Sequence, residues 1–265
     1  MFRKYGFLLL NLSLLLSGCS HIRQRSSILS LDRTYIIKKN QTVYSTAESA
    51  QLKAKRLTVN TPGVLYERND TLFVEFSVTK LPVSNGLNNT VDRSDSGTVF
   101  FTYPNDFSKS SFERTTPWFT YQFTSFDIDL FTIPFKYRFS QVGLPGQLVT
   151  NTNLGVYFGI RHDIGQYRKM FFQSFRRTEL RSFSFGGGGF MSFNPVTLND
   201  FYTNGKIAYE YEAMGYSYGL AGIIGYKALT VGLALGFENL ADRNNPYWIY
   251  RQKPWLGVTI GLNLN

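Results

Sequence analysis

The chain has 265 residues, of which 43% are hydrophobic and 17% aromatic, and a formal net charge of +10 at pH 7. This length allows one large domain. Its single cysteine excludes an internal disulfide and, with only two histidines, a usual zinc site. The residues after about position 60 are rich in Tyr, Phe and Gly and poor in helix formers, a composition that favours strands.

The first 18 residues have the pattern of a signal peptide. Arg3 and Lys4 precede an apolar run over residues 5–16, which is shorter than the roughly 20 residues of a membrane-spanning helix. The sequence Leu16-Ser17-Gly18-Cys19 then resembles the lipobox of bacterial lipoproteins. We therefore expect cleavage before Cys19 and a lipid anchor in which the Cys19 thiol is joined to diacylglycerol. Palmitate is expected among the fatty acids of this anchor. The alternative is an ordinary secretory signal with an incidental cysteine.

Residues 19–60 are predicted to be a lipidated tether that contains a short helix. Residues 20–34 are polar and basic. Residues 45–57 are dominated by helix formers, and Ser45 with Glu48 fits a capping box. We expect this helix to lie in the periplasm or at the mouth of the domain that follows.

Residues 61–265 carry the alternation of β-strands. In residues 256–264, every even position is aliphatic and every odd one is Gly, Thr or Asn, and residues 229–237 alternate with apolar side chains at odd positions. A period of two turns one face outward and the other inward. The predicted strands, of which one is expected to be spurious or merged with its neighbour, are 72–80, 97–103, 118–126, 127–139, 152–163, 181–193, 216–226, 229–239 and 255–265.

The alternation fits a soluble β-sandwich or a membrane barrel. Glycine recurs on the minor face, where a soluble core would hold large side chains, and the apolar face is nearly continuous from strand to strand. The connection from Tyr226 to Leu229 is tight and that from Asn239 to Pro254 is long and polar, as for periplasmic turns and outer loops. We therefore predict an all-β protein of the cell outer membrane, an antiparallel up-and-down transmembrane β-barrel of about eight strands, with ten as the second choice.

The C-terminal half resembles a family of uncharacterised outer-membrane β-barrel lipoproteins of the Bacteroides lineage. The segments that carry the resemblance are Gly219–Gly225, Val231–Phe237, Asn239–Asp242, Tyr247–Tyr250 and Lys253–Gly257 with the strand that follows it to Asn265. The match is best over about residues 127–265. It implies a fold and a location, and it implies no activity, ligand or site.

Strand parity sorts the charged side chains of the predicted barrel. With the large apolar residues facing outward, six charged residues face the interior: Glu75, Lys136, Arg138, Arg161, Asp163 and Glu238. A buried charge without a partner costs several kcal/mol (order of magnitude), so we expect these residues to form a paired network. The alternative is the lining of a pore, although about eight strands leave an interior that side chains just fill.

Aromatic residues gather at the predicted strand ends, where rings with one polar end suit the headgroup level. They are Trp118, Tyr247, Trp248, Tyr250 and Trp255. A ligand-binding role for Trp248 or Tyr250 in the outer loop is the alternative. Arg243, Arg251 and Lys253 of the same loop are expected to face anionic lipopolysaccharide.

No pattern of residues predicts catalysis or a cofactor. His21 lies in the tether, and His162 falls on the lipid-facing parity at a strand end, so neither is expected to act as the base of a serine triad. Gly186–Gly189 continues into a strand rather than the helix of a phosphate loop. We predict a non-enzymatic outer-membrane lipoprotein, a structural or interaction module. The alternatives are a narrow solute or ion pore and a lipid-modifying enzyme.

The expected partners follow from the predicted location. Cleavage lowers the net charge from +10 to +8, because it removes two basic residues. An exported basic protein meets anionic lipid and lipopolysaccharide. Other outer-membrane or periplasmic proteins are further candidates, and nucleic acid is not expected.

Overall fold

The computed structural model describes residues 33–46, 52–68, 71–83, 89–103, 113–141, 143–172, 176–227 and 229–262. Cys19, the predicted signal peptide and His21 lie outside this part of the chain. The described residues form 14 strands joined in one antiparallel sheet, together with short 3₁₀ helices. The prediction of an all-β antiparallel protein is therefore confirmed. In the described part of the chain, no helix has the length and apolar character needed to cross a membrane.

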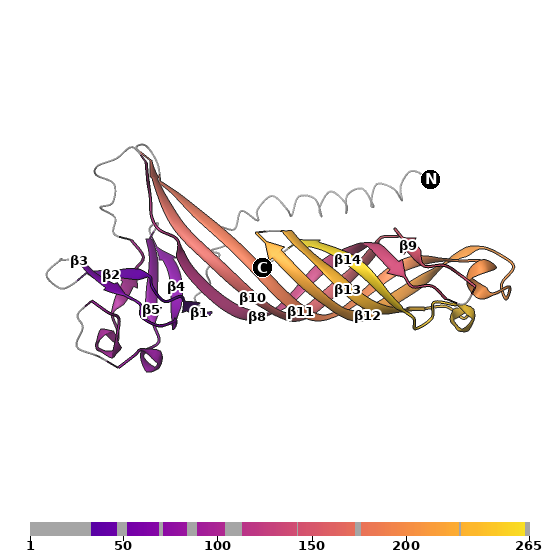
Figure 1. Ribbon diagram of the computed structural model, residues 1–265, viewed down its shortest axis with the longest axis horizontal. Helices are drawn as coiled ribbons and strands as arrows, with labels where there is room; N and C mark the ends of the chain where they lie inside the picture. Colours follow the sequence, from indigo (N-terminus) through magenta and orange to yellow (C-terminus); the bar gives the residue numbers. More distant parts are fainter. Residues whose placement is uncertain are drawn as a thin grey trace, which may run out of the picture.

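Six short strands make the N-terminal sheet, which lies at one end of the molecule (Figure 1). They are β1 (Thr34–Ile37), β2 (Thr42–Thr46), β3 (Leu52–Arg56), β4 (Thr61–Arg68), β5 (Thr71–Phe76) and β6 (Val99–Phe101). Their order is β3-β2-β6-β5-β4-β1, and β1 pairs with the beginning of β8, where Ile37 lies opposite Tyr121. The 3₁₀ helices η2 (Val78–Lys80) and η3 (Arg93–Asp95) lie between β5 and β6.

Six long strands that follow in the sequence pair in a circle, which we call the closed ring. Its strands are β8 (Phe119–Arg138), β10 (Asn153–Phe172), β11 (Arg176–Leu198), β12 (Tyr211–Tyr226), β13 (Leu229–Leu240) and β14 (Pro254–Leu262). Each pairs with the next, and β8 pairs with both β14 and β10, so the circle has no break. The tight turn at Lys227 lies at the end nearer the N-terminal sheet, and the helices η5 (Phe201–Thr203) and η6 (Asn245–Tyr247) lie in loops at the other end (Figure 1).

The predicted count of eight to ten barrel strands is wrong, because six strands form the closed ring. The candidates 118–126 and 127–139 are the single strand β8. The candidates 72–80 and 97–103 overlap β5 and β6, which belong to the N-terminal sheet. The ring therefore begins at β8 and not near residue 61, where the sequence placed the start of the barrel domain.

The helix predicted over residues 45–57 is also wrong. The chain forms β2 and β3 there, with Thr42 opposite Arg56 and Thr46 opposite Leu52. Helix propensity is a weak preference that tertiary contacts override. In β2, Val43 and Ser45 alternate into the protein core, which gives this segment a buried face only as a strand.

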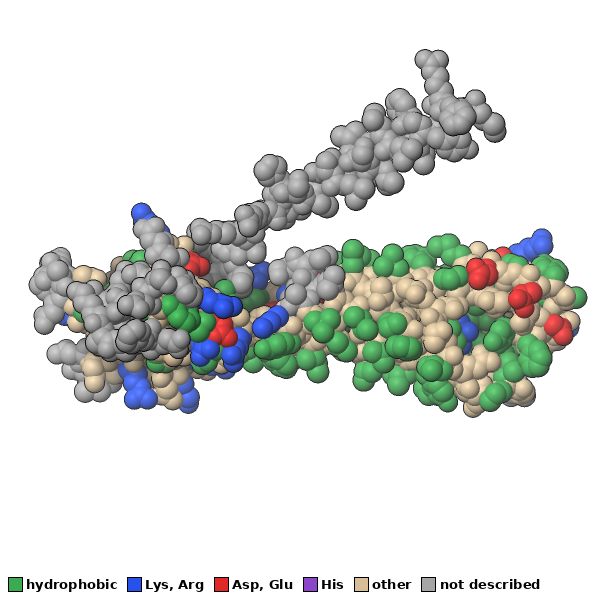
Figure 2. Space-filling view, turned by 90° about the horizontal axis from the view of Figure 1, so that it is seen from above, with side chains coloured by type: hydrophobic (Ala, Val, Ile, Leu, Met, Phe, Trp, Pro, Cys, Tyr) green, Lys and Arg blue, Asp and Glu red, His purple; other side chains and the backbone are tan. Residues whose placement is uncertain are grey.

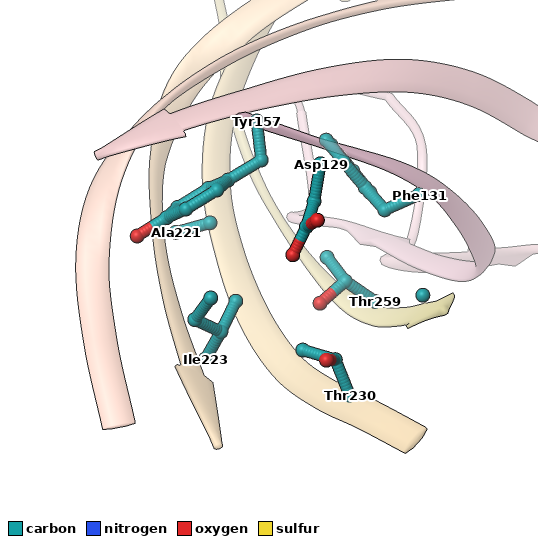
Figure 3. A pocket seen from close by; sticks show the side chains of 8 residues that line it. Asp129, Phe131, Tyr157, Ala221, Ile223, Thr230 and Thr259 are labelled. Carbon is teal, nitrogen blue, oxygen red and sulfur yellow. The ribbon is translucent and has the colours of Figure 1, made fainter. Parts of the chain in front are cut away.

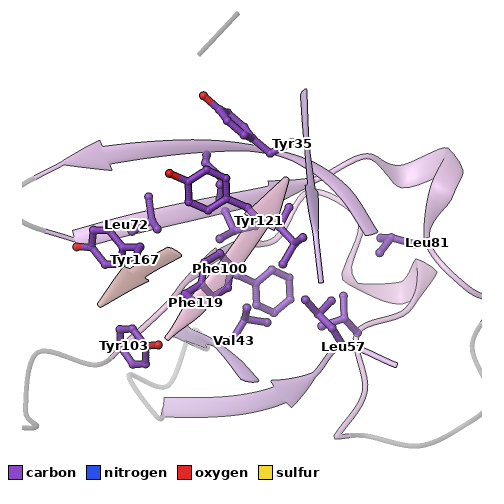
Figure 4. Packing of buried hydrophobic residues seen from close by; sticks show 14 residues of the cluster. Tyr35, Val43, Leu57, Leu72, Leu81, Phe100, Tyr103, Phe119, Tyr121 and Tyr167 are labelled. Atoms are coloured by element: carbon purple, nitrogen blue, oxygen red, sulfur yellow. The ribbon is translucent and has the colours of Figure 1, made fainter. Parts of the chain in front are cut away.

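One buried cluster joins the N-terminal sheet to the long strands (Figure 4). Tyr35, Val43 and Phe100 of the short strands pack with Tyr121 of β8 and Tyr167 of β10. The ring centroids of Tyr35 and Tyr121 are 5.3 Å apart, in an edge-to-face arrangement. The N-terminal sheet is thus held to the closed ring by both backbone pairing and a shared core.

Tyr103 is a buried member of this cluster. Burial raises the pKa of the Tyr103 hydroxyl to about 12, because the charged form loses contact with water. The hydroxyl donates a hydrogen bond to the carbonyl oxygen of Pro117, just before β8. This contact ties the end of the N-terminal sheet to the start of the first ring strand.

Pro134 interrupts the pairing of β8 on both sides. Its lack of a backbone N–H removes a hydrogen bond that a central strand needs. The register with β14 shifts between Val258 and Ile260, and on the other side β9 (Gln147–Val149) ends before β10 begins at Asn153. A shift of this kind changes which residues face inward. On β8 the buried residues are odd-numbered from Asp127 to Ile133 and even-numbered at 136 and 138.

Candidate functional site

The outward face of the closed ring is apolar. Large hydrophobic side chains stay exposed on every strand, for example Leu130, Phe158, Phe193, Leu220, Leu233 and Ile260, one from each of the six strands. Figure 2 shows hydrophobic side chains spread along the ring, while lysine and arginine gather near the N-terminal sheet. An exposed apolar surface of this extent marks contact with a non-aqueous phase or a partner.

A charged network, which we call the mouth network, lies inside the ring at the end that carries the loops. Lys136 Nζ lies 2.6 Å from Oε1 of Glu238, and Nη2 of Arg138 lies 2.7 Å from Oε2 of the same carboxylate. Asn194 Nδ2 donates a further hydrogen bond, of 2.9 Å, to Glu238 Oε1. All four side chains are buried, so one carboxylate balances two cations away from water.

The aromatic residues Trp248, Tyr250 and Trp255 surround this network. Lys136 Nζ lies 4.8 Å from the ring centroid of Trp255, and Cζ of Arg138 lies 5.2 Å from Trp248 and 5.0 Å from Tyr250. The prediction that these three aromatics lie at the lipid headgroups is wrong, because each is at most 3% exposed. The odd, inward parity of residues 255–261 already pointed to the interior for Trp255.

The other predicted headgroup aromatics stay at the surface. Tyr247 is 50% exposed in the loop before β14. Trp118 is half-buried just before β8, and the guanidinium carbons of Arg168 and Arg181 lie 4.3 and 4.5 Å from its ring centroid. Both arginines also bind the carboxylate of Glu179. Trp118 therefore belongs to a charged cluster near the N-terminal sheet.

A second charged network lies deeper in the ring, toward the N-terminal sheet. Arg161 Nη1 is 2.8 Å from Asp127 Oδ2 and 3.6 Å from Asp129 Oδ2, and Arg161 Nε is 3.0 Å from Asp163 Oδ2. All four residues are buried. Among the described residues, no group of three or more His, Cys, Asp or Glu side chains is placed to hold a metal ion.

An apolar layer separates the two networks and fills the ring. It contains Phe131, Ile133, Tyr157, Phe190, Ala221, Ile223, Ala234 and Trp255. Gly236 makes room for it, since an added Cβ would lie 2.6 Å from the Trp255 ring and 2.8 Å from the Phe190 ring. The cavity beneath the layer, where Asp129, Thr230 and Thr259 approach one another, has a volume of about 10 Å³ (Figure 3). That volume holds roughly one water molecule.

Five of the six charges predicted inside the barrel lie in these two networks, and Glu75 does not. The prediction for Glu75 is wrong, because the residue is exposed on β5 of the N-terminal sheet and its Oε1 accepts a hydrogen bond from the Tyr66 hydroxyl at 2.8 Å. Its neighbour Val74 is the residue that faces inward, into the N-terminal core. The parity was assigned the wrong way round because β5 packs against that core, where its apolar face is the buried one.

Three members of the networks were not predicted from the sequence. Asp127 and Asp129 have outward parity when counted from Phe135 and Tyr137, and only the register shift at Pro134 turns them inward. Asn194 is uncharged and was not considered, although it alternates with the exposed Phe193.

His162 is half-buried, with Nδ1 lying 2.9 Å from Thr124 Oγ1.

A polar recess opens beside the mouth network, and we call it the mouth recess. It has a volume of about 460 Å³ and is lined by Arg138, by residues 147–151 and by Val196, Thr197 and Tyr202. The loop before β14 closes the neighbouring part of the mouth, where Ile249 N donates a hydrogen bond of 3.1 Å to the carbonyl oxygen of Tyr202. A volume of this size is within the range of small-molecule sites, roughly 300–1,000 Å³.

The chain matches no protein-family model, no curated protein and no solved structure. The resemblance to outer-membrane lipoproteins of the Bacteroides lineage therefore stays a prediction.

Proposed function

We propose that the protein is a lipid-anchored, integral protein of the bacterial outer membrane and that the closed ring is its transmembrane β-barrel. The observation that carries this proposal is the outward apolar face, which continues around all six ring strands. A closed ring leaves no strand edge unpaired in lipid, and its polar groups point inward.

The two ends of the ring support an orientation. Short turns of outer-membrane barrels face the periplasm and long loops face outward. The tight turn between β12 and β13 lies at the end of these strands that is nearer the N-terminal sheet, and the loops that contain η5 and η6 lie at the opposite end (Figure 1). In this orientation the N-terminal sheet lies in the periplasm, and the exposed Arg243, Arg251 and Lys253 face lipopolysaccharide.

We further propose a non-enzymatic role as a structural or interaction module. The filled interior supports this role over that of a pore, since an apolar layer lies between the two charged networks and the cavity next to it holds about one water molecule. The surfaces left for partners are the N-terminal sheet on one side of the membrane and the loop end on the other. A barrel with stable conductance in planar bilayers would contradict this role.

Replacing Leu233 with arginine tests the membrane proposal. Leu233 is 59% exposed in the middle of β13, so in a water-soluble protein an arginine there would be tolerated. On the lipid face of a barrel it is expected to destabilise the folded state by about 2–4 kcal/mol. The measurement is urea unfolding of protein refolded into lipid vesicles, with heat-modifiable gel migration as the readout of the folded fraction.

Phe201→Arg is the matched control for Leu233→Arg. Phe201 is 73% exposed in η5, among the loops at the end of the ring. The same change of apolar side chain to arginine is expected to alter stability by less than about 0.5 kcal/mol there. Equal effects of the two variants would contradict a membrane-facing ring wall.

Replacing Cys19 with alanine tests the lipid anchor. Cys19 is the single cysteine of the chain, so the variant is expected to lose all incorporation of radioactive palmitate and to accumulate as the uncleaved precursor. Ser20→Ala keeps the lipobox cysteine and is expected to retain the label. Labelled Cys19→Ala protein would show that the lipid is attached elsewhere or that the assignment of the signal is wrong.

A further inference from the structure

We propose that the mouth recess binds a small hydroxylated carboxylate, such as a sugar acid, through Arg138. This site goes beyond the proposed function and depends only on the geometry of the ring mouth.

One nitrogen of the Arg138 guanidinium, Nη1, is free to donate a hydrogen bond to a ligand. Its Nε and Nη2 donate to Glu238 Oε2, at 3.2 and 2.7 Å. Within the described part of the chain, Nη1 has no hydrogen-bond partner, and Arg138 is a lining residue of the mouth recess. A guanidinium nitrogen that is free to donate is a strong partner for a carboxylate, because charge-assisted hydrogen bonds are roughly twice as strong as neutral ones.

The charge of the mouth network favours an anion. Lys136 and Arg138 share the single carboxylate of Glu238, which leaves the network with a net charge of +1. The arginine is also held in place, because its Cζ lies 5.2 Å from the ring centroid of Trp248 and 5.0 Å from that of Tyr250. A pre-positioned cation at the base of a recess loses little entropy when it binds a ligand.

Buried polar atoms beside Arg138 also indicate a polar environment. Among the described residues, Asn194 Oδ1, Trp248 Nε1 and Tyr250 OH have no hydrogen-bond partner. Buried polar groups of this kind are usually satisfied by ordered water or a ligand. These three residues do not line the mouth recess, so ordered water between them and the recess would satisfy these atoms and add to the polar character of the ring mouth.

The walls of the recess favour hydroxyl groups next to the carboxylate. The recess is lined by Gln147, Thr150, Asn151 and Thr197, whose amide and hydroxyl groups donate and accept hydrogen bonds. Tyr202 adds an aromatic ring to the lining. Polar groups of this type, placed around an arginine, match a ligand with one carboxylate and several hydroxyls better than a simple inorganic anion.

The first test is calorimetric titration of the full mature chain, refolded in detergent micelles, with glucuronate. We expect saturable one-to-one binding of glucuronate, binding of glucose at least ten-fold weaker, and binding of inorganic phosphate at least ten-fold weaker. No saturable binding of glucuronate overturns the proposal. Equal affinity for glucose removes the role of the carboxylate, and equal affinity for phosphate removes the role of the hydroxyls, so either result also overturns it.

Two variants separate the recess from the stability of the ring. Arg138→Gln leaves Lys136 and Glu238 as a neutral pair, and Thr197→Phe enlarges a lining residue of the recess that takes no part in the mouth network. Each is expected to weaken glucuronate binding at least ten-fold, while Thr197→Phe keeps the unfolding midpoint of the parent. Arg251→Gln, which removes an exposed charge from the neighbouring loop, is expected to bind like the parent. Binding that survives Thr197→Phe, or that is lost in Arg251→Gln, places the ligand elsewhere and overturns the proposal.

Discussion

Glu238→Ala is expected to destabilise the closed ring by about 3–5 kcal/mol, the usual cost of removing one partner from a buried ion pair. Glu238 is 1% exposed and is the carboxylate bound by both Lys136 and Arg138. Without it, the ring mouth holds two buried cations that repel each other, and the amide of Asn194 loses the closer of its two acceptors. The measurement is the free energy of unfolding in urea, followed by tryptophan fluorescence, since Trp255 lies beside Lys136.

The variant Lys136→Met is the comparison that makes this prediction specific. It removes a charge from the same network but leaves Arg138 and Glu238 as a pair, so we expect a loss well below that of Glu238→Ala. Glu212→Ala removes an exposed carboxylate from β12 and is expected to change stability by less than about 0.5 kcal/mol. Equal losses for Glu238→Ala and Lys136→Met would mean that packing, and not unpaired charge, dominates the ring mouth.

Local patterns in the sequence predicted the C-terminal strands well. The predicted strands 216–226, 229–239 and 255–265 overlap β12, β13 and β14 closely, because a period of two in side-chain character depends only on neighbouring residues. The same periodicity predicted Lys136, Arg138, Arg161, Asp163 and Glu238 as inward residues. All five lie buried inside the ring.

The sequence patterns did not predict which strands pair with one another in the ring and which pair in the N-terminal sheet. The strands around Leu72 and Phe100 alternate as ring strands do, yet they bury their apolar faces in the N-terminal core. Alternation alone does not say whether an apolar face meets lipid or a protein core. The number of ring strands and the start of the ring both depended on this distinction.

Two different causes account for the errors at the site. Pro134 reverses the inward parity within β8, so Asp127 and Asp129 were hidden from a count that started at Phe135. The aromatic residues Trp248 and Tyr250 lie in a loop, where no periodicity indicates a direction, and the loop folds back over Arg138. For the two aromatic residues, the decisive information is a contact between segments far apart in the chain.

Arg161 lies at the opposite end of the ring interior from Glu238. Arg161→Leu is expected to destabilise the protein by a similar amount, again about 3–5 kcal/mol. Arg161 is 3% exposed and contacts Asp127, Asp129 and Asp163. Removing the cation leaves three buried carboxylates close together, which raises the cost of desolvation and adds mutual repulsion. The measurement is urea unfolding of protein refolded into lipid vesicles.

A second change in the Arg161→Leu background tests the electrostatic cause. Asp127→Asn removes one negative charge from the closest contact, 2.8 Å from Arg161 Nη1, and is expected to restore part of the lost stability. In the parent chain the same Asp127→Asn change removes a favourable pair and is expected to destabilise the protein. The effect of Asp127→Asn on stability is thus expected to be opposite in the two backgrounds. A dependence of this kind between two sites is what a double-mutant cycle measures. If Asp127→Asn destabilises both backgrounds equally, the aspartates do not depend on Arg161 for their charge balance.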